Sequence, residues 1–113
     1  MLLSLALYAD STIEDLEERS RECARSPGGS SYGGDALSAF WGDLDFMWKC
    51  APPGRPESEA LSLYLVIDED GYLSELKITP ETEIAKCILR ETADRKMPKP
   101  PFGDYVIKIN LNL

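Results

Sequence analysis

The sequence predicts an α+β fold, in which a small three-stranded antiparallel sheet has helices packed on one of its faces. Two observations lead to this prediction. Three segments in the second half of the chain alternate apolar and polar residues, as half-buried strands do. Three other segments repeat apolar residues at the helical period. The expected order along the chain is helix, helix, strand, strand, helix, strand.

The first helix is expected over residues 11–25. Thr12 is a candidate N-cap, and Glu14 and Asp15 follow in the first turn, where the helix dipole favours acids. The apolar stripe of this segment is narrow, so the helix is expected to lie on the surface of the fold. Residues 26–34 contain four glycines and one proline, which predicts a flexible loop.

A second helix is expected over residues 35–49, because large apolar residues recur there at helical spacing. These residues are Leu37, Phe40, Trp41, Leu44, Met47 and Trp48. Such an aromatic stripe could line a binding groove. Packing of the stripe against the sheet is the favoured interpretation.

The second half of the chain predicts a hairpin, a helix and a last strand. Leu61, Leu63, Leu65 and Ile67 alternate along the first strand, and residues 68–71 form an acidic turn that ends in glycine. After a second strand, a helix is expected from about residue 81. The segment Pro98–Pro101 then stops the helix and directs the chain into a closing strand.

Charge and residue content exclude several classes of function. The 113 residues carry a net charge of −8, which argues against a nucleic-acid-binding surface. The chain has no histidine, so the usual Ser-His and Cys-His nucleophile pairs cannot form. The acids fall in helix first turns and in the hairpin, where structural roles explain them. We therefore expect no catalytic residues, no metal site, no cofactor and no enzymatic activity.

The cysteines and the first residues bear on the compartment. Cys23, Cys50 and Cys87 form no CxxC pair, so they are either reduced core residues of a cytoplasmic protein or include one disulfide in an oxidising compartment. Residues 1–9 form a short apolar run that ends at Ala9, as in a truncated secretion signal, although it has no basic start. The alternative for this run is a short element packed on the core. It is too short to span a membrane.

Residues 35–113 resemble the C-terminal periplasmic domains of TolA and TonB, with TolA the closer of the two. The shared features are a strand, an acidic-glycine hairpin, a second strand, a helix with a cysteine, a P-x-P-P exit and a closing strand. Asp70, Gly71, Cys87 and the prolines of residues 98–101 occupy these places. The preceding aromatic helix also resembles the helix before the first strand in that family. On this basis residues 1–9 and 10–34 are separate N-terminal elements.

The resemblance implies a non-catalytic periplasmic or secreted module that binds a cell-envelope protein, in part by strand addition at a sheet edge. It also implies a disulfide from Cys87. The family partner at the start of the first strand is replaced here by Ala60 and Leu61, so Cys50 is the nearer candidate and Cys23 the other. The candidate partner-binding residues lie in the last strand. They are Tyr105, Ile107, Lys108, Ile109, Asn110, Leu111 and Asn112.

A second function is compatible with the charge of the chain. A small acidic immunity or inhibitor protein could block the basic cleft of a toxin, guided by electrostatic attraction. The acids of the first helix would supply the contact surface. They are Glu14, Asp15, Glu17, Glu18 and Glu22. The sequence leaves open the identity of the partner and the oligomeric state.

Overall fold

The three strands of the protein form one antiparallel sheet in the order β2-β1-β3. They are β1 (Ala60–Ile67), β2 (Leu73–Thr79) and β3 (Tyr105–Asn112). The computed structural model describes residues 11–51 and 60–112, so the expectations for residues 1–9 lie outside the described residues. The predicted α+β class and the three antiparallel strands are confirmed.

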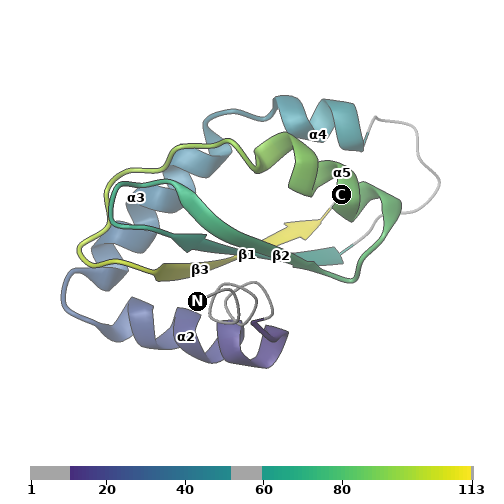
Figure 1. The fold of residues 1–113 in the computed structure, drawn as a ribbon. Coiled ribbons are helices and arrows are strands. Elements are labelled where there is room, and N and C mark those ends of the chain that lie inside the picture. Colours follow the sequence, from purple (N-terminus) through teal and green to yellow (C-terminus); the bar gives the residue numbers. More distant parts are fainter. Residues whose placement is uncertain (1–10, 52–59, 113) are drawn as a thin grey trace, which may run out of the picture.

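Helices cover both faces of this sheet, and the expectation that they would share one face is wrong. Helix α2 (Ile13–Arg25) lies below the sheet in Figure 1, whereas α3 (Gly29–Trp41), α4 (Asp45–Cys50) and α5 (Glu83–Thr92) lie above it. The reason is that β1 is apolar on both sides. The side chains of Tyr64 and Val66 point toward α2 and are as buried as their neighbours in the strand.

The prediction that the apolar residues at alternate positions of the first and last strands share one buried face is confirmed. Leu61, Leu63, Leu65 and Ile67 are buried on one face of β1. Each pairs with a buried residue of β3, from Leu111 opposite Leu61 to Tyr105 opposite Ile67. These two rows form the centre of the core below α3, α4 and α5.

The glycine-rich segment is helical, so the loop predicted for residues 26–34 is shorter than expected. Helix α3 begins at Gly29, and Gly28 precedes it with a φ of 77°. A Cβ atom on Gly29 would lie 1.8 Å from the carbonyl oxygen of Cys23. Only glycine allows α3 to begin this close to the end of α2. Tyr32 of the same segment is buried, and its hydroxyl donates to the carbonyl of Pro98 at 2.6 Å.

The second expected helix is interrupted between Trp41 and Asp45, so residues 11–51 contain three helices where two were predicted. The guanidinium of Arg95 donates to the carbonyls of Phe40 and Asp43 at this break. Because the two halves no longer share one axis, the predicted stripe does not face the core as a whole. Phe40 is buried, but four of the large side chains are exposed. They are Leu37, Trp41, Leu44 and Trp48.

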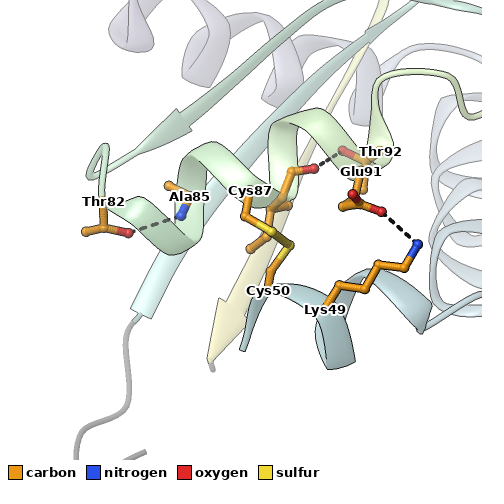
Figure 2. The surroundings of a disulfide bond; sticks show 8 residues. Lys49, Cys50, Thr82, Ala85, Cys87, Glu91 and Thr92 are labelled. Atoms are coloured by element: carbon orange, nitrogen blue, oxygen red, sulfur yellow. Dashed lines mark hydrogen bonds and ion pairs between the residues drawn. A yellow bond between two sulfur atoms is a disulfide. The ribbon is translucent and has the colours of Figure 1, made fainter. Parts of the chain in front are cut away.

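A disulfide joins α4 to α5. Cys50 and Cys87, the pair favoured by the sequence, are bonded, with 5.5 Å between their Cα atoms (Figure 2). Lys49 also pairs with Glu91 of α5 at 3.2 Å. Helix α5 begins later than expected, because the hydroxyl of Thr82 caps it by accepting from the N–H of Ala85.

The turn between β1 and β2 is hydrogen-bonded to the segment that follows α5. Gly71 has a φ of 95°, which favours glycine, and its carbonyl accepts from the N–H of Met97 at 2.8 Å. The chain therefore runs back along the hairpin before the prolines. It then turns at Asp104, whose φ is 56°, and enters β3.

Candidate functional site

Strand β3 lies at one edge of the sheet, because only β1 pairs with it among the described residues. In an antiparallel pair, successive residues direct their backbone N–H and C=O groups to opposite sides of the strand. The N–H of Val106 donates to a group outside the sheet, which fixes the pattern. The N–H and C=O groups of Lys108 and Asn110 therefore point away from β1, at the outer edge.

The candidate partner-binding residues divide into two sets. Tyr105, Ile107, Ile109 and Leu111 have buried side chains in the core, so these side chains are not available to a partner. Lys108 is half-buried, and Asn110 and Asn112 are exposed on the face toward α2. A partner can therefore contact mainly the backbone of β3, together with these three polar side chains.

The beginning of this edge is already covered by α2. The thiol of Cys23, which is buried, accepts from the N–H of Val106 at 3.4 Å. The hydroxyl of Tyr105 donates to the carbonyl of Gly29 at 2.6 Å, which holds the start of α3 beside the same end. An added strand could therefore pair with Lys108 and the residues that follow it, but not with Val106.

A groove of about 400 Å³ runs between α2 and α3, with β3 at its base. The side chains of Glu17, Arg21 and Leu37 line its walls together with several small residues. The small residues include Ser20 and Ala24 of α2 and Gly33 and Gly34 of α3. Val106 and Lys108 lie at the base.

Glu17 anchors α2 to the sheet. Its Oε1 atom accepts from the hydroxyl of Tyr64 at 2.5 Å and from Lys108 Nζ at 2.9 Å, and its Oε2 lies 3.3 Å from Arg21. These hydrogen bonds lower the pKa of Glu17 below its ordinary value of 4.5, with that from Tyr64 the largest cause. Burial, with the bond to Glu17, raises the pKa of Tyr64 to about 12.

Sequence reasoning missed Glu17 and Cys23 as parts of this edge. Glu17 was counted only among the acids of the first helix, and Cys23 was assigned either to the core or to a disulfide. One signal was present: "LSLYLVI" in β1 is apolar at nearly every position, as in strands covered on both faces. Such a strand requires a covering element on its second face, and the helix predicted over residues 11–25 can supply it.

No protein-family model, curated protein or solved structure matches this chain. The resemblance to TolA and TonB therefore rests on the residues of this sequence alone. Over residues 11–51 and 60–112, no group of His, Cys, Asp or Glu has the arrangement of a metal site. In the same ranges no helix has both the length and the apolar character that a membrane crossing requires.

Replacing Glu17 by glutamine should lower the free energy of unfolding by about 1 kcal/mol at neutral pH, because the ion pair with Lys108 is lost. The folded state depresses the pKa of Glu17, so its contribution is present above the ordinary value and is lost as the pH falls through the folded-state pKa. Urea unfolding at a series of pH values should show the two proteins converging below pH 4.5.

Glu14→Gln is the matched control. It removes an acid from the same helix that forms no ion pair within the described part of the chain, so only its interaction with the helix dipole, about 0.3 kcal/mol, is lost. A difference between Glu17→Gln and the parent protein that stays constant down to strongly acidic pH would contradict the assigned role of Glu17.

Proposed function

We propose that this chain is a non-catalytic protein-binding module of the bacterial periplasm, similar to the C-terminal domains of TolA and TonB. Its partner is another protein of the cell envelope, which adds a strand to the outer edge of β3. One observation carries this proposal. The backbone groups of Lys108 and Asn110 point away from the sheet, and Lys108 lies at the base of a groove bounded by two helices.

The partial protection of this edge favours one selective partner over pairing with any exposed strand. Natural proteins protect free edges with charges or covering elements. Here Cys23 covers the edge at Val106, and Lys108 places a charge in the middle of the strand. The remaining open stretch is short, so a partner needs the walls of the groove as well as the backbone groups.

The disulfide supports the proposed compartment. Structural disulfides form and persist in the periplasm and outside the cell, and they are rare in the cytoplasm. The bond between Cys50 and Cys87 therefore favours a periplasmic or secreted protein over a cytoplasmic one.

Contacts within α2 make the inhibitor function the weaker candidate. Asp15 pairs with Arg19, and both Glu17 and Glu18 pair with Arg21. Three of the five acids that would attract a basic enzyme are thus already paired with arginines of the same helix. Strand addition remains the function that the geometry supports best.

A proline at position 110 tests the proposal. Asn110→Pro removes an N–H group that no strand of the described sheet uses, so the fold should persist, as proline is tolerated at sheet edges. Binding to the partner should weaken by about tenfold or more. The measurement is capture of envelope proteins by the purified chain, with circular dichroism to confirm folding.

Two further variants make the result specific. Asn110→Ala changes the side chain but keeps the backbone N–H, so it should retain binding. Ile109→Pro removes a group that pairs with β1, so it should unfold the protein. If Asn110→Pro captures the same proteins as the parent chain, binding by strand addition is wrong.

A further inference from the structure

Helix α4 presents three chemically different sides, since successive residues of a helix are about 100° apart. Phe46 and Cys50 point into the protein and are buried. Asp45 and Lys49 line a polar cavity of about 480 Å³ between α4 and the end of α5. The third side is apolar and faces outward, over a pocket of about 120 Å³. Its residues are Leu44, Met47, Trp48 and Ala51.

Trp48 stands out on this apolar side of α4. It is 67% exposed, more than any other large apolar side chain described in the structure. Leu44, one turn before it, is 41% exposed. Tryptophan is normally well buried, and exposed apolar groups of this kind mark interaction surfaces. Tryptophan is also the residue type most enriched among those that dominate binding energy.

The protein holds this short helix in a fixed orientation. Six residues do not form a stable helix on their own, so contacts with the rest of the fold must maintain α4. The disulfide ties its end to α5 (Figure 2). At its beginning, Arg95 donates to the carbonyl of Asp43 and lies over the ring of Phe46 at 5.2 Å. The apolar side is therefore presented outward before any partner binds, which reduces the entropy lost on binding.

The charged groups without an ion partner beside the apolar side of α4 are carboxylates. Asp43, Asp45 and Asp94 line the adjoining cavity and form no ion pair within the described residues. The three cations of the same cavity already have partners, because Lys49 pairs with Glu91, Arg95 donates to backbone carbonyls, and Lys96 lies over the ring of Tyr72. Asp43 also accepts a hydrogen bond from the N–H of Asp45, so a partner that covers α4 meets apolar groups flanked by carboxylates without an ion pair.

We propose that the apolar side of α4 is a docking surface for a cationic amphipathic segment of a partner protein. An apolar side chain of that segment enters the pocket beside Trp48, and its lysines or arginines lie over Asp43 and Asp45. This surface is independent of the β3 edge and of the proposed function, because its residues are separate from those of the groove. A net charge of −8 disfavours an anionic membrane as the occupant.

Calorimetric titration with a designed peptide tests this docking surface. The probe is a synthetic amphipathic helix of leucine and lysine, about 15 residues long, used at physiological salt. It should bind the parent chain. Trp48→Ala should weaken binding by about thirtyfold, and Asp45→Asn by about threefold. Both positions are exposed, so the unfolding midpoint should not change.

Matched controls separate this surface from general attraction between opposite charges. Tyr72→Ala removes another exposed aromatic residue, and Glu14→Gln removes another exposed acid; both should leave the affinity unchanged. Equal binding of a leucine–glutamate helix would overturn the proposal, as would equal affinity of Trp48→Ala and the parent chain. Capture by phosphatidylcholine vesicles that depends on Trp48, without peptide binding, would also overturn it in favour of a lipid surface.

Discussion

Replacing Cys50 and Cys87 by serine is expected to lower the free energy of unfolding by about 4 kcal/mol. The two cysteines are 37 residues apart, and the bond removes the freedom of that long loop from the unfolded chain. Folded contacts contribute as well, because α4 has only six residues and depends on α5 to stay in place. A loss of this size is a large share of the stability of a domain of 113 residues.

Urea unfolding of the parent and double-serine proteins measures this effect, with and without a reducing agent. Reductant should destabilise the parent chain to the level of the double variant and should have no effect on the double variant itself. Cys23→Ala is the control for the unpaired thiol, and this protein should keep the full response to reductant. A loss below about 1 kcal/mol would mean that the bond adds little to the constraint already given by the packing.

The strands could be predicted from the sequence because their signal is local. Leu61, Leu63, Leu65 and Ile67 recur at every second position, as do Tyr105, Ile107, Ile109 and Leu111, and each of these rows lies on one face of the sheet. The position of the last strand at an edge could not be read in this way. The pairing order β2-β1-β3 depends on how the helix between β2 and β3 crosses the sheet, which no short segment encodes.

The arrangement of the helices depended on distant residues, and there the predictions failed. The break between α3 and α4 is held by Arg95, which lies 52 positions from Asp43 in the sequence. Helical periodicity across residues 35–49 cannot reveal a residue so far away. The apolar sequence of β1 indicates a second covered face, but the helix that covers it is determined by distant contacts such as that of Glu17 with Tyr64.

Replacing Gly29 by alanine is expected to lower the free energy of unfolding by about 3 kcal/mol. The added methyl group would lie 1.8 Å from the carbonyl oxygen of Cys23, which is backbone and cannot rotate away. Relief requires α3 to move from the end of α2. That movement also weakens the hydrogen bond from Tyr105 to the carbonyl of Gly29, at the closed end of the groove.

Gly34→Ala is the matched comparison, since it lies in the same helix and, beyond the neighbouring residues and backbone of that helix, no atom is within 4 Å of the added carbon. Alanine there should raise the free energy of unfolding by about 0.5–1 kcal/mol, because alanine favours the helical state. Chemical denaturation of the two variants measures both effects. If residues 29–34 were instead a flexible loop, both substitutions would leave stability nearly unchanged, so opposite signs are the specific result expected of a helix that begins against α2.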